Sequence, residues 1–151
     1  MKSKISHIEM NVLNYINTIK FYDIIFPPMG FKRINCMKEW TAYSDGQCKI
    51  IICPTDDKFK HDGFHRKRAG LNHLAFYADS VEDVDKFHDE ILVPNNINSL
   101  YESKPFGDNQ YYAVFFEGPD RIKLEFVYAP NYCDENSWPS NLEDDFDPYE
   151  S

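Results

Sequence analysis

The feature that most restricts how this chain can fold is an internal repeat. Residues 4–53 carry the pattern of a strand, a helix and three further strands, and residues 71–128 carry the same five elements again. Residues 54–70 between them are charged and irregular, which is typical of a linker. With 151 residues, of which 42% are hydrophobic, the chain is large enough for one domain with a sizeable core. We therefore expect one α+β domain over residues 1–130.

The first half begins with a clear strand pattern. From Ile5 to Val12, polar and apolar residues alternate, as they do in a strand with one buried face. Asn14 is a suitable cap for a helix that runs to about Phe26, where two prolines follow. This helix covers the apolar face of the sheet. Further strands are predicted at about 31–36, 40–43 and 49–53.

The second half repeats the order. A strand is predicted over 71–78, and Ser80 begins a helix whose apolar stripe continues to Ile91. Strands follow at about 98–102, 111–116 and 122–128, the last two separated by a turn at residues 118–120.

Charge and hydropathy exclude several classes of protein. The net charge is −9, but residues 131–151 contain seven acidic side chains and no basic one, so the body is nearly neutral. A near-neutral body with an acidic tail argues against nucleic-acid binding, which needs a basic face. No apolar run reaches the ~20 residues of a membrane span, and the first residues do not resemble a signal peptide. We expect a cytoplasmic protein. The four cysteines have no paired spacing and are assigned no chemistry.

Three side chains occupy matching places in the repeat. His7 and His73 lie on the first strand of each half, and Glu125 lies on the last strand of the second half. Alternation turns all three away from the face that the helices cover. Two histidines and one carboxylate leave open positions on a divalent ion, as catalytic sites do. The alternative is a protein that binds no metal at this place, in which Glu125 forms an ion pair with Lys123 or Arg121.

The chain resembles the vicinal oxygen chelate superfamily, which includes glyoxalases, bleomycin-resistance proteins and extradiol dioxygenases. The resemblance covers about residues 4–130 and depends on three motifs: Ser6-His7-Ile8-Glu9 leading to Ile19-Lys20-Phe21-Tyr22, then Gly70-Leu71-Asn72-His73-Leu74-Ala75-Phe76, and Gly118-Pro119-Asp120-Arg121-Ile122-Lys123-Leu124-Glu125. It implies two βαβββ modules whose mixed sheets curl into a cup around a metal, often completed by a second subunit. It also implies that His7, His73 and Glu125 are metal ligands.

One position departs from the family pattern. The last strand of the first module would supply a fourth ligand, and that position falls on Ile51, which cannot bind metal. This puts standard glyoxalase I chemistry in doubt and favours a three-ligand site that suits Fe(II) or Mn(II). Glu9 faces the cup beside His7, so it is a candidate catalytic base or substitute ligand.

Aromatic residues on the middle strands are candidates for binding substrate, although many such residues belong to a core. They are Trp40, Tyr43, Tyr111, Tyr112 and Phe115. Because Tyr112 alternates with Tyr111 and Phe115, only one of these sets can face a ligand. At the turn before the last strand, Asp120-Arg121 replaces the usual Asp-Gly of the family. A type I turn tolerates the arginine, whereas a left-handed conformation there would be strained.

These observations predict a metal-dependent enzyme that binds one Fe, Mn, Ni or Zn ion and a small substrate through two neighbouring oxygens. Lyase, isomerase and dioxygenase reactions all remain open, and a homodimer is expected. The alternative is a metal-free protein that sequesters a drug-like molecule, as a bleomycin-resistance protein does.

Overall fold

The computed structural model describes residues 3–134. The prediction for the acidic tail concerns residues 131–151, and positions 135–151 lie outside the described residues. Within the described part of the chain, no helix is long and apolar enough to cross a membrane.

The first module has the predicted elements. The Asn14 side chain accepts a hydrogen bond from the Asn17 backbone N–H, so it caps the helix as expected. The elements are β1 (His7–Val12), α1 (Tyr15–Ile25), the 3₁₀ turn η1 (Pro27–Met29), β2 (Lys32–Cys36), β3 (Thr41–Ser44) and β4 (Lys49–Pro54). A 3₁₀ helix, η2 (Asp57–Asp62), forms part of the linker.

The second module repeats this order with one additional strand. Ser80 caps its helix through the Asp83 backbone N–H, and the helix ends in a π-helical turn. The elements are β5 (His73–Tyr77), α2 (Val81–Lys86), η3 (Phe87–Leu92), β6 (Ser99–Leu100), β7 (Phe106–Asp108), β8 (Tyr111–Glu117), η4 (Pro119–Arg121) and β9 (Lys123–Tyr128). The sequence pattern did not predict β7.

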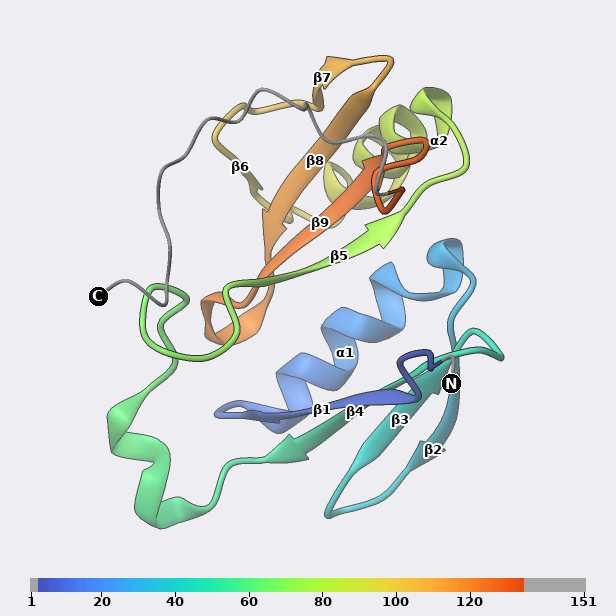
Figure 1. Cartoon of the computed structure of the whole chain (residues 1–151). Helices are drawn as coiled ribbons and strands as arrows, with labels where there is room; N and C mark the ends of the chain where they lie inside the picture. Colours follow the sequence, from blue (N-terminus) through green and yellow to red (C-terminus); the bar gives the residue numbers. More distant parts are fainter. Residues whose placement is uncertain (1–2, 135–151) are drawn as a thin grey trace, which may run out of the picture.

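The two sheets have the same topology. Sheet A has the strand order β1-β4-β3-β2, and sheet B has the order β5-β9-β8-β6, with β7 paired to β8. In each sheet the first and last strands of the module are parallel neighbours, and the other pairs are antiparallel. The repeat in the sequence is therefore a repeat in the structure (Figure 1).

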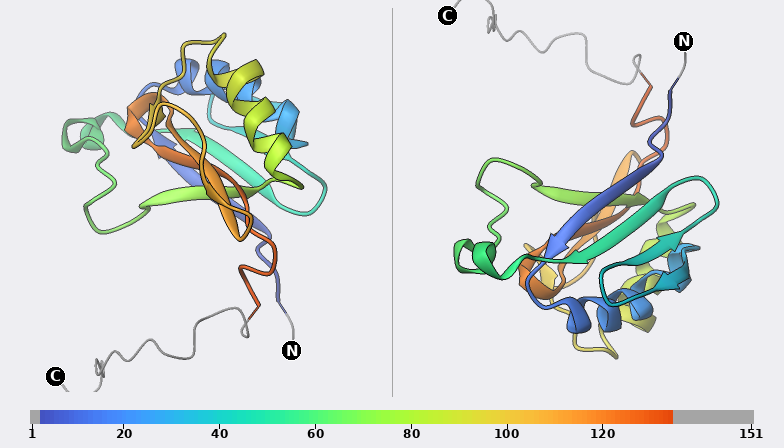
Figure 2. Two further views of the ribbon diagram at one scale, coloured as in Figure 1. Left: turned by 90° about the horizontal axis from the view of Figure 1, so that it is seen from above. Right: turned by 90° about the horizontal axis from the view of Figure 1, so that it is seen from below.

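A single core joins the modules. Helix α1 packs against β4 of sheet A and against η3 of the second module, and both views in Figure 2 show α1 and α2 on one side of the strands. Phe26 contacts Phe76 of β5 with ring centroids 5.7 Å apart, and Phe21 lies 6.4 Å from Phe116 of β8. The other face of each sheet carries no helix. We call these the helix-free faces: His7, Glu9, Asn11, Lys49, Ile51 and Cys53 on sheet A, and His73, Ala75, Tyr111, Phe115, Lys123 and Glu125 on sheet B.

The turn η4 also connects the modules. The Asp120 carboxylate accepts hydrogen bonds from the backbone N–H groups of Leu13, at 2.5 Å, and Asn14, at 3.3 Å. These donors stand at the start of α1, where backbone N–H groups lack partners within the helix. Asp120 and Arg121 both have a φ of 61°, so the strained left-handed conformation does occur at this turn.

Candidate metal centre and cavity

His73 and Glu125 come together on the helix-free face of sheet B. Strands β5 and β9 are parallel, with His73 opposite Lys123 and Ala75 opposite Glu125. Facing residues on adjacent strands share a face, so the imidazole and the carboxylate project to the same side. The Nε2 atom of His73 lies 3.0 Å from Oε2 of Glu125.

Asn72 determines which ring nitrogen of His73 is available to bind a metal ion. Its side-chain nitrogen donates to the Arg66 carbonyl at 3.3 Å, which turns its oxygen toward Nδ1 of His73, 2.8 Å away. Nδ1 therefore carries the proton in the neutral imidazole, and the lone pair is on Nε2. Residues that hydrogen-bond to metal-binding histidines usually fix the same tautomer.

The remaining pair of atoms suits a cation. A lone pair on His73 Nε2 and a carboxylate oxygen of Glu125 are both acceptors, so their approach to 3.0 Å requires a proton or a metal ion between them. Two adjacent ligands of an ion bound at about 2.1 Å are about 3 Å apart in octahedral geometry. The two donors thus fit a divalent ion. No group of three or more His, Cys, Asp or Glu side chains that could hold a metal occurs among residues 3–134.

The second oxygen of Glu125 is held by Tyr111. The tyrosine hydroxyl donates to Oε1, and the glutamate is only 1% exposed. Burial, and then the hydrogen bond to Glu125, raise the pKa of Tyr111, so the phenol remains protonated and can act as the donor. Glu125 forms no ion pair with Lys123 or Arg121, the partners expected in a protein that binds no metal. Arg121 contacts Glu117, with Nε 3.5 Å from the carboxylate.

A cavity of about 250 Å³ opens in front of this pair. Its walls are largely apolar and aromatic, as is usual for sites that bind small organic molecules. The Tyr77 hydroxyl lies 3.0 Å from the Cys133 thiol, and this hydrogen bond, followed by burial, raises the pKa of Tyr77 to about 12. The lining residues are His73, Ala75, Tyr77, Tyr111, Glu125, Val127, Tyr132 and Cys133.

Sequence reasoning missed five of these residues: Ala75, Tyr77, Val127, Tyr132 and Cys133. Tyr77 could have been found, because strand alternation places it on the same face as His73 and Ala75. Tyr132 and Cys133 follow the last strand, where no periodic pattern indicates which way a side chain points.

His7 and Glu9 lie elsewhere, on the helix-free face of sheet A. Both are exposed, and Glu9 accepts a hydrogen bond from the Cys53 thiol at 3.3 Å. Burial, and then this contact with Glu9, raise the pKa of Cys53 to about 11, so the thiol stays neutral and donates. Of the three predicted metal ligands, one chain brings together only His73 and Glu125.

The predicted substrate-binding aromatics divide between the two faces of the sheets. Tyr111 and Phe115 face the cavity side, and the Phe115 ring lies 6.2 Å from that of His73. Tyr43 and Tyr112 do not: Tyr43 donates to Asp23 of α1 at 2.9 Å, and Tyr112 donates to Asp85 of α2 at 2.8 Å. Their strand positions face the helices, so these two hydroxyls lie away from the candidate site. Trp40 is 36% exposed and directly precedes β3.

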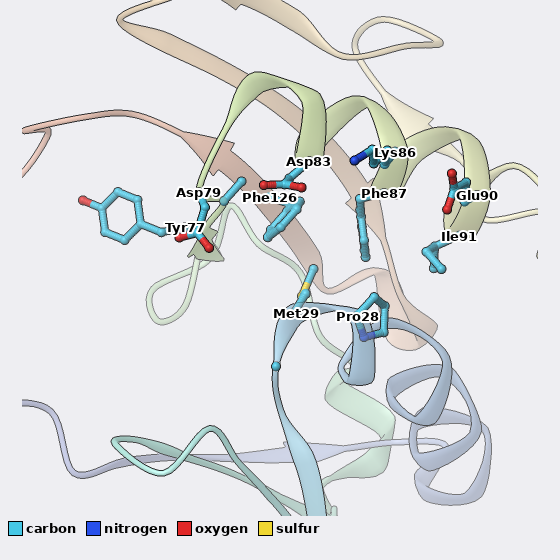
Figure 3. A pocket seen from close by; sticks show the side chains of 12 residues that line it. Pro28, Met29, Tyr77, Asp79, Asp83, Lys86, Phe87, Glu90, Ile91 and Phe126 are labelled. Carbon is cyan, nitrogen blue, oxygen red and sulfur yellow. The ribbon is translucent and has the colours of Figure 1, made fainter.

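A larger hollow, of about 390 Å³, lies between η1 and the second helix. Figure 3 shows Pro28 and Met29 facing Phe87 and Phe126 across it. It contains neither His73 nor Glu125. The candidate site is therefore the smaller cavity, where polar groups converge.

Comparison with known proteins agrees with the fold and the repeat. Residues 4–126 match the family described as "Glyoxalase/Bleomycin resistance protein/Dioxygenase superfamily", and the chain belongs to this superfamily. It is 34% identical over 127 residues to "Uncharacterized protein YqjT" of Bacillus subtilis (strain 168), an alignment that covers 83% of this chain and 98% of that protein.

Solved structures show the same architecture. The crystal structure of a "putative glyoxalase" from Bacillus halodurans is 36% identical, with a TM-score of 0.77, covering 84% of this chain and 96% of that one. The fosfomycin resistance protein FosX of Listeria monocytogenes is 22% identical, with a TM-score of 0.63, covering 85% of this chain and 95% of that one. The second likeness concerns the fold alone.

Proposed function

We propose that this protein is a metal-dependent enzyme of the superfamily, acting on a small substrate that offers two neighbouring oxygens. The observation that carries the proposal is the pair of acceptor atoms on His73 and Glu125, 3.0 Å apart, with Asn72 holding the imidazole in the ligand tautomer. The ion would be Fe, Mn, Ni or Zn. When bound, it would serve as a Lewis acid for negative charge that develops on the substrate oxygens, or, in the case of iron, for dioxygen chemistry.

The third ligand in this proposal is His7 of a second copy of the chain. His7 stands opposite Lys49 in sheet A, as His73 stands opposite Lys123 in sheet B, so the two histidines hold equivalent register positions. His7 is exposed on a face without a helix. In a two-fold symmetric homodimer, each site takes His7 from one protomer and the remaining two ligands from the other, which gives two equal sites.

Glu9 would enter the site together with His7. A carboxylate on the same strand face, two residues from a ligand, is suitably placed to take a proton from a carbon next to a carbonyl group. This role fits lyase or isomerase chemistry. With a substrate found by screening, Glu9→Gln should abolish turnover and keep the metal. Unchanged metal content together with unchanged turnover contradicts any role for Glu9.

Metal analysis tests the central proposal. Untagged protein analysed by inductively coupled plasma mass spectrometry should contain close to one Mn, Fe, Ni or Zn ion per chain, and His73→Ala and Glu125→Gln should lose it. The matched controls are His65→Ala in the linker and Glu90→Gln on η3, both exposed. A wild-type protein that is purified without metal and takes none up on addition contradicts the proposal.

Mixing two inactive variants tests the shared site. In a mixed dimer, the His7→Ala chain supplies His73 and Glu125, and the Glu125→Gln chain supplies His7, so one of the two sites is complete. Random exchange of protomers should restore about a quarter of the wild-type sites. No restoration after exchange of protomers contradicts a site built from two copies.

The second candidate is a metal-free binding protein. Two observations favour it: the cavity beside His73 is mostly apolar, and Ile51 stands where a further ligand would be. In that case the purified protein carries no metal, and alanine at His73 leaves ligand binding intact.

A further inference from the structure

Lys123 is a buried cation on the same face as the candidate metal ligands. It lies on β9, two residues before Glu125, and directly opposite His73 on β5. The residue is only 7% exposed. The equivalent position of the first module is occupied by Lys49, which is exposed on sheet A. The burial of Lys123 is therefore not a consequence of strand position alone.

No carboxylate neutralises Lys123 among residues 3–134. Its cross-strand neighbour on β8 is Glu117, but that carboxylate forms ion pairs with Arg66 and Arg121 instead. Glu117 is thus engaged by two guanidinium groups and forms no ion pair with Lys123. A buried ammonium without a counter-ion is costly, and such groups are usually paired.

The contacts of Lys123 compensate this cost only in part. Its Nζ atom donates to the Tyr101 hydroxyl at 3.3 Å, and it lies 5.7 Å from the Tyr101 ring centroid and 5.4 Å from that of Phe115. The two aromatic faces attract the ammonium, but they are neutral. An ammonium has three N–H donors, and one is used here.

Phe115 connects this ammonium to the candidate metal centre. Its ring lies 6.2 Å from the imidazole of His73 and 5.4 Å from the ammonium of Lys123, so the two groups flank one ring. Two residues along a strand span about 7 Å, which is the length of a small organic molecule. A substrate of this length held by His73 and Glu125 would reach Lys123 past the Phe115 ring, since neither Phe115 nor Lys123 lines the 250 Å³ cavity itself.

We propose that Lys123 binds an anionic group of the substrate, a carboxylate or a phosphate-like oxyanion, at the end of the molecule away from the chelating oxygens. The unused donors of the ammonium favour an oxyanion over a neutral group. The proposal deepens the proposed function and rests on it for the position of the chelating oxygens. It restricts the substrates to small acids that also carry two neighbouring oxygens.

A pair of chelating probes tests this subsite. Catechol and 3,4-dihydroxybenzoate share two neighbouring oxygens and differ by one carboxylate. Bound to Co²⁺-loaded protein without oxygen and followed by the visible cobalt spectrum, the carboxylate probe should bind about tenfold more tightly than catechol. Lys123→Met should remove this preference, and Lys123→Arg should keep most of it. Lys32→Met, on the exposed strand β2, should leave it unchanged.

Equal affinity of the wild-type protein for the two probes, or a preference that persists in Lys123→Met, overturns the proposal. A protein that takes up no cobalt contradicts the metal function, and a separate measurement then decides on Lys123. Inorganic phosphate is titrated into EDTA-treated protein and followed by ¹⁵N NMR. Amide shifts around Lys123 in the wild-type protein that are lost in folded Lys123→Met support the anion subsite, and their absence in the wild-type protein overturns it.

Discussion

Glu9 on β1 lies directly opposite Ile51 on β4, and in the second module the same two positions are held by Ala75 and Glu125. Each module thus pairs one carboxylate with one apolar residue, but on opposite strands. This exchange explains why the first module lacks the family's fourth ligand and still carries a carboxylate on the same face. The register confirms that Ile51 is the equivalent of Glu125.

Replacing Ile51 should restore the missing ligand. In the proposed dimer, Ile51→Glu, combined with Glu9→Gln to avoid two adjacent carboxylates, adds a fourth donor beside His7. We expect Zn²⁺ to bind at least about tenfold more tightly, because one more charged ligand contacts the ion. Isothermal titration calorimetry measures the change. The control is Ile51→Gln with Glu9→Gln, and equal affinity of these two double variants contradicts the proposed position.

Tyr111 should act as a positioning residue for Glu125. Tyr111→Phe removes the donor to Oε1 and leaves the ring, so the carboxylate loses its fixed orientation. Loss of such a contact typically lowers metal affinity about tenfold or more. Tyr112→Phe is the matched control, because that hydroxyl contacts Asp85 on the helix side. Titration with Co²⁺ gives both the affinity and the visible spectrum. This role is contradicted if the affinity and the spectrum of Tyr111→Phe both equal those of the wild-type protein.

Asp120 should stabilise the whole domain. Asp120→Ala leaves the backbone N–H groups of Leu13 and Asn14 without their acceptor, and we expect a loss of about 1–2 kcal/mol in the free energy of unfolding. Asp120→Asn keeps an acceptor oxygen and should retain most of the stability. Urea denaturation followed by circular dichroism measures both variants. The interpretation fails if the alanine and asparagine variants are equally stable.

Arg121 should be a site where glycine increases stability. Its φ of 61° is unfavourable for a residue with a β-carbon, by roughly 1 kcal/mol or more. We expect Arg121→Gly to raise the free energy of unfolding by about 0.5–1 kcal/mol, and Arg121→Ala to give no gain. Urea titration compares the three proteins. A glycine variant that is no more stable than the alanine variant shows that this backbone is not strained.

Asp45 should give the β3–β4 turn a pH-dependent stability. Hydrogen bonds from the backbone N–H groups of Cys48 and Gln47 hold the pKa of its carboxyl below the usual range. A lowered pKa in the folded state means that the stabilisation is present above the pKa of the unfolded chain and is lost as the pH falls through the folded value. Asp45→Ala should therefore be less stable than wild type at pH 7, with a gap that narrows at pH 3.

The comparison for Asp45 is made by urea denaturation at pH 7, 5 and 3. Asp45→Asn keeps an acceptor but cannot titrate, so its stability relative to Asp45→Ala should depend little on pH. A gap between wild type and the alanine variant that stays constant from pH 7 to pH 3 contradicts the prediction.

Local patterns predicted the elements of this fold well. Asn14 and Ser80 cap the two main helices as expected, because a capping side chain acts on neighbours in the sequence. Strand β7 was missed, since its three residues Phe106–Asp108 are too few to show alternation. The pattern indicated no face for Tyr43, because a four-residue strand with Ala42 and Thr41 shows no clear distinction between its two sides.

The site was only half predictable. His73 and Glu125 lie on parallel neighbouring strands of one module, so the repeat was enough to bring them together. Whether His7 of the same chain reaches them depends on how the modules pack against each other, and strand periodicity carries no information about that. The aromatic contacts of Phe26 and Phe21 with the second module determine it, and such pairs are not recognisable before the fold is known.

The shared core also determines how the chain would respond to cutting. Because Phe26 of the first module packs against Phe76 of the second, the linker of residues 54–70 is not the only connection between the modules. A protease that nicks the exposed helix η2 should release no fragment, and the two pieces should migrate as one particle until they are denatured. We therefore expect that the repeated unit of the sequence does not fold alone.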